Sequence, residues 1–341
     1  MLAVAAALLG LFLRNVDLWH ALGEISRAQP SWLALSLATM FVNLAIRSRR
    51  WQYLLEPLGP TSFGSAFRAT AVGFAASTVL PARAGELIRP YFLARQDHMS
   101  ATGAFATIIL ERLLDVVTVL VLLASYVFFF GRDQGGANPV VFKAVKWAGA
   151  TAAAGAFAAL VVLFVVAGDP ARLGRTFARL EQVVPSTFAG LIAQIAEKFA
   201  TGLGVIRRPD RLLVALAWSF PLWLSIGLGI WAVAMAFRFA VPFTGSFLLM
   251  ALLVIGVAVP TPGAIGGFHE AFRVGATMFY GAPDDAAVGA AIVLHAFSIG
   301  PSLILGLFFA AQAGLSMAGM RRLADQPEET RTAQPRGLRT L

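Results

Sequence analysis

Charged residues in two stretches rich in proline and glycine are the residues of this 341-residue chain best suited to chemistry. The first stretch, PARAGELIRP, holds Glu86 and Arg89, and the second, PTPGAIGGFHEAFR, holds Glu270 and Arg273. Both are Glu-x-x-Arg pairs inside long apolar regions. Residues three apart share one face of a helix, so such a carboxylate and guanidinium can pair. An arginine whose charge is not balanced by a carboxylate can also bind a phosphate group through two of the phosphate oxygens.

Composition predicts that both stretches lie in a membrane. Hydrophobic residues make up 58% of the chain and charged residues 13%, whereas soluble domains carry about 25% charged residues. We expect an all-α integral membrane protein of about six to eight transmembrane helices. The membrane domain would cover 1–319, and a disordered basic cytoplasmic tail would cover 320–341. A bilayer tolerates helix breaks and charges only where protein or a water-filled cavity shields them. Residues 81–90 and 260–273 therefore mark the expected site.

Several functional classes are disfavoured. Cysteine is absent, which excludes disulfides, thiolate metal sites and thiol catalysis. No Ser/His/Asp order, phosphate-binding loop or metal-ligand cluster stands out, so we expect no enzyme, no cofactor and no metal. The net charge is +9, but the basic residues lie at the ends of apolar runs and in the tail, as the positive-inside rule predicts. Nucleic acid is therefore not an expected partner.

A third group of charges lies in the apolar run 103–130. Glu111 and Asp115 are four residues apart and share a helix face, and Arg112 is three residues from Asp115. One charge at the centre of a spanning helix costs about 2.5–3.5 kcal/mol on insertion scales. These groups must therefore pair, face a cavity or lie at the headgroup level. We expect the arginines of residues 81–90 to meet the two carboxylates.

Two roles remain open for this charge network of Glu86, Glu111, Arg112 and Asp115. It can be a buried ion-pair lock that holds residues 81–90 against their neighbour. Alternatively, it forms a polar pocket whose surplus arginines bind lipid phosphate. Arg83 and Arg89 are the candidate phosphate ligands, because they flank a helix break where a helix N-terminus also favours an anion.

The second stretch supplies flexibility and a titratable pair. Pro260, Pro262, Gly263, Gly266 and Gly267 break the helix and allow close backbone approach. His269 and Glu270 stand next to each other at membrane depth, so a proton-coupled step is possible there. His295 in the last apolar run can join them or serve only as a hydrogen-bonding residue between helices.

The basic residues at 47–50 have a simpler interpretation. Residues 31–46 form an apolar span, and Arg47, Arg49 and Arg50 follow it, next to Trp51. We interpret these arginines as a cytoplasmic anchor that ends the span, with headgroup contact as a secondary role.

Arginine and lysine also orient the spans. The segment 168–211, amphipathic at helical spacing over 185–206, and the tail are the most basic, so we place both in the cytoplasm. The N-terminal apolar run is short for a crossing, but we expect it to be the first transmembrane helix. Residues 64–100 and 244–281 then become re-entrant hairpins that enter from the cytoplasm and from outside, respectively. Eight full crossings are the alternative.

The two halves of the chain read as an inverted repeat. Residues 31–130 and 212–314 each follow the order span, hairpin, span, in opposite orientations. The two Glu-x-x-Arg pairs are separated by one common offset of 184 residues. Inverted repeats whose broken helices meet near the bilayer midplane are typical of transporters. Chance spacing between two unrelated hairpins is the alternative.

Four strings of residues resemble a known family. RSRRWQYLL, LPARAGELIRPYFLAR, IILERLLDVV and PTPGAIGGFHEA are similar to the transmembrane (flippase-like) domain of lysylphosphatidylglycerol synthases. The resemblance covers essentially the whole chain. It implies a multi-pass protein of the prokaryotic plasma (inner) membrane. In the bifunctional synthases this region is linked to moving aminoacylated phospholipid between leaflets, and other members accompany glycolipid, hopanoid or prenyl-linked sugar pathways.

Two departures limit what the resemblance implies. The sequence ends soon after the last apolar run, so we expect a stand-alone member without the soluble aminoacyltransferase domain. The family often has Glu directly after the PGxxGxF string, where this chain has His269 followed by Glu270. No family role is therefore transferred to either residue.

Together these features predict a lipid flippase that moves an anionic phospholipid or a lipid-linked intermediate between leaflets. The expected partners are membrane lipids with anionic headgroups, and a lipid-modifying or glycosyltransferase enzyme is a further candidate partner. A non-transporting membrane scaffold or regulator of such an enzyme is the alternative function. An intramembrane enzyme is a third, but it requires a nucleophile or a metal that the sequence does not reveal.

Overall fold

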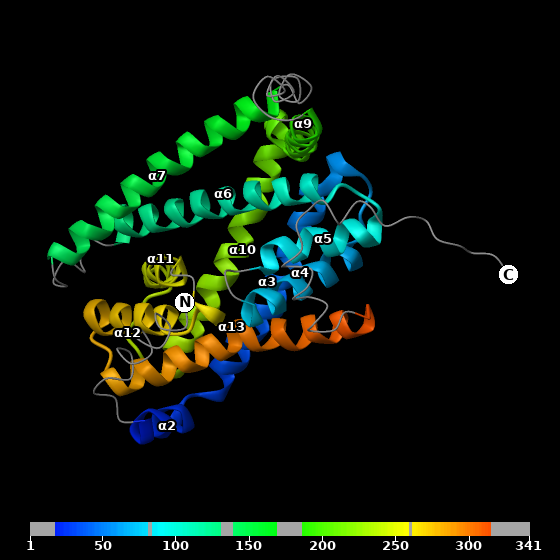
Figure 1. The fold of residues 1–341 in the computed structure, drawn as a ribbon. Coiled ribbons are helices and arrows are strands. Elements are labelled where there is room, and N and C mark those ends of the chain that lie inside the picture. Colours follow the sequence, from blue (N-terminus) through cyan, green and yellow to red (C-terminus); the bar gives the residue numbers. More distant parts are fainter. Residues whose placement is uncertain (1–17, 81–83, 131–138, 169–185, 259–260, 315–341) are drawn as a thin grey trace.

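The computed structural model describes residues 18–80, 84–130, 139–168, 186–258 and 261–314, and in these ranges every regular element is helical (Figure 1). The helices are α2 (Leu18–Arg27), α3 (Pro30–Leu55), α4 (Phe63–Val79), α5 (Gly85–Asp97), α6 (Ala101–Ser125), α7 (Pro139–Gly168), α9 (Ser186–Gly202), α10 (Pro209–Ala236), α11 (Gly245–Ala258), α12 (Gly267–Tyr280) and α13 (Asp284–Gln312). The prediction of an all-α fold is confirmed. The N-terminal apolar run, Arg83, Pro260 and the basic tail lie outside the described residues.

Four of the described helices are long and apolar enough to cross a membrane. They are α3 with the turn after it, the Trp147–Gly168 part of α7, α10 and α13. The 25-residue α6 has the length but carries three charged residues. Large apolar side chains on α7, such as Phe157, Val162 and Val165, are exposed on the monomer. A bilayer would cover such a face, since soluble surfaces rarely expose so much apolar area together.

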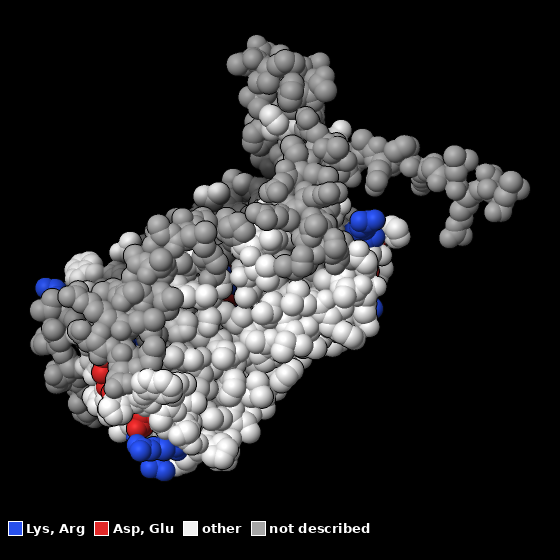
Figure 2. Space-filling model, turned by 60° about the horizontal axis from the view of Figure 1, so that its bottom comes forward, with Lys and Arg blue, Asp and Glu red and all other residues white. Residues whose placement is uncertain are grey.

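The surface agrees with this interpretation. On the face shown in Figure 2, most of the visible charged side chains lie at the ends of the described surface, and the broad area between them is almost entirely uncharged. A belt of uncharged surface between charged ends is the pattern expected where hydrocarbon contacts protein.

Helices α3 and α10 form an antiparallel pair in the middle of the molecule (Figure 1). Ser36 Oγ donates to the carbonyl of Gly229 at 3.0 Å, where the absence of a side chain lets the two backbones approach. At one end of the pair, the N–H of Gln29 donates to the carbonyl of Ala236 at 3.0 Å. Helix α3 does not end at residue 46 as predicted, because it continues through its arginines to Leu55.

Helices α4 and α5 form one helical hairpin, and α11 and α12 form another. Each helix has 13 to 17 residues, fewer than the roughly 20 needed to cross a bilayer. In Figure 1 the hairpins lie towards opposite ends of α6 and α13, which run antiparallel to each other. No arm of either hairpin is therefore long enough to cross a bilayer as a straight helix.

Both hairpins close on a pair of glycines. A Cβ at Gly85 would overlap the carbonyl oxygen of Gly73, and a Cβ at Gly267 would overlap the carbonyl oxygen of Gly256. Any side chain at these positions would force the two arms apart. The glycines therefore set the distance between the arms of each hairpin.

Helix α9 covers the start of α6 near the end of the molecule where the α4–α5 hairpin lies (Figure 1). A Cβ at Gly202 would overlap the backbone of Gly103, so the two helices meet closely. Ala200 on α9 is buried, whereas the side chains of Glu197 and Lys198 are exposed. The predicted amphipathic character of this segment is thus visible in its packing, and residues 169–185 lie outside the described ranges.

Candidate functional site

Glu111 on α6 is the centre of a buried charge cluster. Its Oε1 lies 3.1 Å from Nη1 of Arg47 and 3.1 Å from Nη1 of Arg89. It lies 3.5 Å from Nη2 of Arg50 and 3.5 Å from Nη2 of Arg112. The Glu111 side chain is fully buried. One carboxylate therefore ties α3 and α5 to α6.

Asp115 is the second buried carboxylate, one helical turn further along α6. Its Oδ1 lies 2.8 Å from Nη1 of Arg50 and accepts a hydrogen bond from Trp223 Nε1 at 3.0 Å. Its Oδ2 lies 3.3 Å from Nη1 of Arg47 and 3.4 Å from Nη1 of Arg112. Both carboxylate oxygens thus have positively charged or N–H partners.

The local sequence explains how these groups reach one another. Ser100 Oγ accepts the N–H of Gly103 at 3.1 Å and begins α6, and four-residue spacing then places Glu111 and Asp115 on one face. On α3, Asn43, Arg47 and Arg50 follow a four-then-three spacing, which is also one helix face. The two faces meet where α3 crosses α6.

Arg89 rests on an aromatic surface. Its guanidinium carbon lies 3.9 Å from the centre of the Trp51 ring, an arrangement in which the ring face attracts the cation. Trp51 Nε1 in turn donates to Thr107 Oγ1 at 3.0 Å. A Cβ at Gly73 would lie 2.6 Å from the Cβ of Arg89, so this glycine makes room for the arginine.

The cluster carries more positive than negative charge. Four guanidinium groups meet three carboxylates; they belong to Arg47, Arg50, Arg89 and Arg112, and to Glu86, Glu111 and Asp115. Nε of Arg47 and both Nε and Nη2 of Arg89 are buried and have no hydrogen-bond partner among the described residues. A buried donor left unpaired costs about 1–3 kcal/mol, and more when it is charged. An anion bound here would meet both the surplus charge and these donors.

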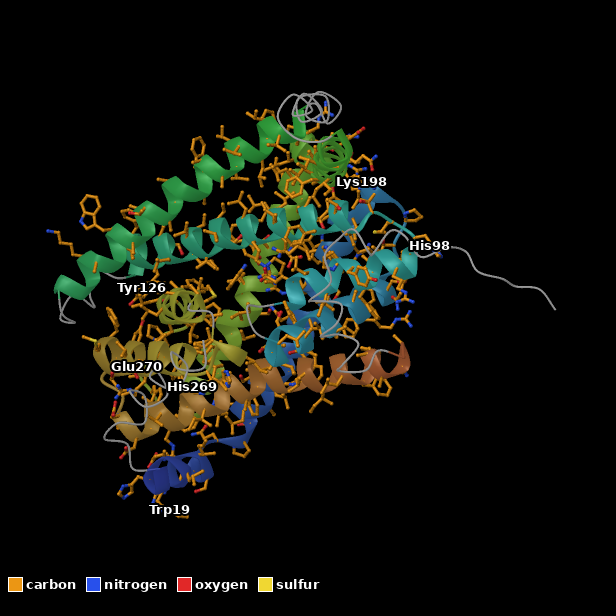
Figure 3. The ribbon with its side chains drawn as sticks, viewed as in Figure 1. Trp19, His98, Tyr126, Lys198, His269 and Glu270 are labelled. Atoms are coloured by element: carbon orange, nitrogen blue, oxygen red, sulfur yellow. The ribbon has the colours of Figure 1, made fainter. Side chains whose placement is uncertain are left out.

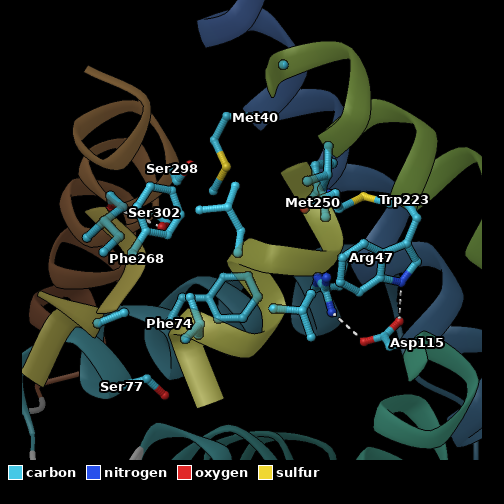
Figure 4. Close-up of a pocket in the computed structure, with 18 of the residues that line it drawn as sticks. Met40, Arg47, Phe74, Ser77, Asp115, Trp223, Met250, Phe268, Ser298 and Ser302 are labelled. Carbon is cyan, nitrogen blue, oxygen red and sulfur yellow. Dashed lines mark hydrogen bonds and ion pairs between the residues drawn. The ribbon is translucent and has the colours of Figure 1, made fainter. Parts of the chain in front are cut away.

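A cavity of about 540 Å³ lies in front of the cluster (Figure 4). Its walls come from α3, α4, α5, α6, α10, α11, α12 and α13 and from the segment before α12. Arg47, Arg89, Arg112 and Asp115 line it, whereas Arg50 and Glu111 do not. The cluster therefore has a front layer on the cavity and a back layer sealed in protein. Ligand pockets typically measure about 300–1,000 Å³, so the cavity is large enough for a small molecule or a headgroup.

The structure separates two residues that the sequence grouped with the buried network. Glu86 Oε1 lies 3.7 Å from Nε of Arg112, and their side chains are 36% and 39% exposed. Both line the cavity, so they lie at its accessible edge rather than in the sealed layer. Arg83 lies outside the described residues, so only Arg89 of the two predicted phosphate ligands is placed.

The second Glu-x-x-Arg pair lies away from this cavity. Arg273 binds both oxygens of Glu270, at 2.9 and 2.8 Å, and also lies 3.0 Å from the carboxylate of the exposed Asp284. This closed ion-pair group joins α12 to the start of α13. Glu270 and Arg273 therefore do not contribute to the Arg89 site. Although the two Glu-x-x-Arg pairs correspond in the sequence repeat, only the first pair lines the cavity.

His269 and His295 lie next to each other beside the second helix break. Their ring centres are 4.3 Å apart, His295 Nε2 lies 2.7 Å from the carbonyl of Gly263, and the N–H of Gly266 donates to His269 Nδ1. Figure 3 shows His269 and Glu270 on α12. Pro262 belongs to the short turn Pro262–Ala264, in which Gly263 has φ of 60°. No group of three or more metal-ligating side chains occurs among the described residues.

The interpretation of Arg47 and Arg50 as an anchor at the end of a span is wrong. Both side chains are buried, and both pair with Glu111 and Asp115. Arg49, between them, is exposed and donates to Gln52. The face shared with Asn43 was the sequence signal for this arrangement. It was concealed because a row of arginines after an apolar run normally marks the end of a span.

Comparison with known proteins agrees with the fold and with the motifs that carry the charges. A family model described as the lysylphosphatidylglycerol synthase transmembrane region matches residues 1–306. The chain belongs to this family. The resemblance noted from four short strings is thereby confirmed, and with it a multi-pass membrane protein of the lysylphosphatidylglycerol synthase transmembrane family.

Two curated relatives of this family member are similar at low identity. Glycosyltransferase AglD of Haloferax volcanii is 23% identical over an alignment of 334 residues that covers 89% of this chain and 52% of that protein. A UPF0104 membrane protein of Methanocaldococcus jannaschii is 25% identical over 104 residues, or 30% of this chain and 31% of that protein. The chain thus spans about half the length of the first relative and a third of the second.

Proposed function

We propose that this protein translocates an anionic phospholipid or lipid-linked intermediate between the two leaflets of a prokaryotic plasma membrane. Its headgroup phosphate would bind at Arg89, with Arg47 and Arg112 beside it and Arg83 as a further ligand. In this proposal the chain itself catalyses no covalent step. Its C-terminus faces the cytoplasm.

The observation that carries the proposal is the two-layer charge cluster. A lock that only holds helices together needs no cavity and no surplus charge. Here the sealed layer of Arg50 and Glu111 already provides the lock, and a front layer with three arginines faces open space. Arginines with unpaired N–H groups in such a space favour an anion, since a phosphate accepts two of those N–H bonds at once.

The arrangement of the hairpins supports transport. Helices α3 to α6 and α10 to α13 follow the same order of long helix, two short helices and long helix. Both hairpins contribute to the wall of the one cavity. We take them as re-entrant segments of an inverted repeat, whose alternate rocking would expose the cavity to each leaflet in turn.

A membrane scaffold is the second candidate, and the longer relative favours it. That protein is named as a glycosyltransferase, and this chain matches about half of its length. The shared region can therefore accompany a glycosyltransferase or another lipid-modifying enzyme as its partner. A scaffold needs no lipid movement, which makes the two functions distinguishable.

Lipid movement by purified protein in proteoliposomes tests the proposal. Arg89→Ala and Arg112→Gln should each slow the transbilayer movement of a fluorescent anionic phospholipid by about ten-fold or more, as expected when a charged hydrogen bond is lost. Arg49→Gln is the matched control, because Arg49 is exposed and lies outside the cavity. Unchanged movement in an Arg89→Ala protein that inserts and folds normally rules out the phosphate role.

A further inference from the structure

The uncharged part of the cavity wall carries hydroxyl groups. Ser36 and Thr39 come from α3, Ser225 from α10, and Ser298 and Ser302 from α13. Figure 4 shows Ser298 and Ser302 on the opposite side of the cavity from Arg47 and Asp115. Ser298 and Ser302 thus face the charged cluster across the cavity, whereas the hydroxyl groups of α3 and α10 lie on the wall that Arg47 also lines.

Each of these hydroxyl groups already donates its proton to a backbone carbonyl. Ser36 donates to Gly229, and the four others donate to carbonyls three or four residues earlier in their own helices, all at 2.6–3.0 Å; they are Thr39, Ser225, Ser298 and Ser302. A hydroxyl has one donor and two acceptor positions. Each of these hydroxyl oxygens can therefore still accept a hydrogen bond, but none has a proton left to donate.

The amide of Asn43 extends this wall. Its Nδ2 donates to the carbonyl of Leu222 at 3.1 Å and to Ser225 Oγ at 3.2 Å. The donor end of the amide is thus used within the protein, and Asn43 lines the cavity. Like the hydroxyl groups, it has an acceptor oxygen left and no spare donor, so these polar side chains, set in a largely apolar wall, match a ligand with several O–H donors.

We propose, resting on the function proposed above, that the headgroup is a phosphate-linked polyol or sugar without a cationic group. Its phosphate lies at Arg89, and its hydroxyl groups donate to the oxygen atoms of α3, α10 and α13. Figure 4 shows Trp223 beside Arg47 and Phe268 beside Ser302, so each side of the cavity has an aromatic ring against which the carbon face of the polyol would pack.

The same cavity disfavours an aminoacylated headgroup. An ammonium group in such a place needs a carboxylate partner. Asp115 already has Arg47, Arg50 and Trp223 around it, and Glu86 pairs with Arg112 at the cavity edge. The headgroup phosphate balances the one surplus positive charge of the cluster, so no negative charge is left in the cavity to balance an ammonium group. A lysyl headgroup would therefore bind worse than the glycerol headgroup from which it is made.

The test compares four lipids in proteoliposomes of phosphatidylcholine that carry each lipid at the same mole fraction. Phosphatidylglycerol and phosphatidylinositol have phosphate and hydroxyl groups, phosphatidate has phosphate alone, and lysylphosphatidylglycerol adds a cation. We expect the first two to move about ten-fold faster than the last two, the effect of one or two hydrogen bonds. Equal rates for phosphatidylglycerol and lysylphosphatidylglycerol overturn the proposal.

A pair of serine substitutions tests the hydroxyl wall. Ser298→Ala with Ser302→Ala should slow phosphatidylglycerol by about five-fold and leave phosphatidate unchanged. Ser48→Ala is the matched control, since Ser48 is buried, donates to the carbonyl of Leu44 and does not line the cavity. If the double variant slows phosphatidylglycerol and phosphatidate equally, or slows neither of them, the two serines do not recognise the hydroxyl groups of the headgroup.

Failure of transport is separable from failure of this inference. If none of the four lipids moves, the proposed transport is wrong, and binding then decides the headgroup question. Thermal stabilisation of the detergent-solubilised protein should be greater with phosphatidylglycerol than with lysylphosphatidylglycerol at equal concentration. The reverse order, or equal stabilisation, contradicts a headgroup site for polyols.

Discussion

At the scale of single residues, Glu111 is the residue on which the charge cluster depends. It is fully buried, and its carboxylate meets the guanidinium groups of Arg47, Arg50 and Arg89. Loss of one partner from a buried ion pair costs about 3–5 kcal/mol, because the other charge stays buried without compensation. Glu111→Gln should therefore lower the thermal unfolding temperature of the detergent-solubilised protein by several degrees.

The control for that variant lies in the same cluster. Glu86→Gln removes a carboxylate whose side chain is 36% exposed and whose distance to Arg112 is 3.7 Å. Pairs that water reaches contribute about 1 kcal/mol or less, so this variant should unfold close to the wild-type temperature. If Glu86→Gln lowered the unfolding temperature as much as Glu111→Gln, the distinction between the sealed and accessible layers would be mistaken.

How far the site followed from the sequence is clearest at this scale. The cost of burying charge predicted that Arg89 must meet a carboxylate on α6, and Glu111 lies 3.1 Å away. Arg47 and Arg50 were instead interpreted as the anchor that ends a span, and this gave the wrong place because α3 was expected to end at residue 46. Where a helix ends depends on whether neighbours can satisfy its charges, and the two carboxylates that satisfy Arg47 are 64 and 68 residues away in the chain.

At the scale of elements, the glycine pairs are the reason that each hairpin closes. Gly267→Ala would push a Cβ into the carbonyl oxygen of Gly256. Overpacking of this kind costs about 1–3 kcal/mol or more, and the arms of the hairpin must separate to relieve it. We expect a lower unfolding temperature, measured on purified protein, and a loss of lipid movement.

Gly155→Ala on α7 is the matched control for this prediction. Nothing lies within 4 Å of a Cβ built there, and alanine favours a helix over glycine by about 1 kcal/mol. This variant should be as stable as the wild-type protein or slightly more stable. A Gly267→Ala protein that behaves like Gly155→Ala would show that the hairpin arms are not held at the distance described.

At the scale of the whole molecule, the packing fixes which helix ends lie together. Arg211, in the first turn of α10, pairs with Glu56, just after α3, at 2.8 Å, while Gln29 and Ala236 meet at the opposite end of the same two helices. Figure 3 shows His98 and Lys198 at one side of the molecule, and Tyr126 and Glu270 at the other. We therefore expect Glu56, His98, Lys198 and Arg211 to lie on the same side of the membrane as the basic segment that precedes α10.

Labelling of single cysteines tests the orientation. The chain has no cysteine, so each variant carries one reactive thiol. In intact right-side-out cells, a membrane-impermeant maleimide should label Ala240→Cys, after α10, and should label Thr201→Cys, on α9, only after permeabilisation. Both residues are exposed. The reverse labelling pattern would show that the protein has the opposite orientation, with the basic segment outside the cell.

The sequence by itself determined the class of this protein and the chemistry of its site. Apolar content required a membrane, and the cost of charge in a bilayer required pairs among Arg89, Glu111 and Asp115. Only the tertiary structure decided which charges are sealed and which face the cavity, and that Glu270 with Arg273 forms a separate ion-pair group. The physical reason is that a helix pattern gives the direction of a side chain around its own axis. The depth, partners and solvent access of that side chain come from other helices distant in the sequence.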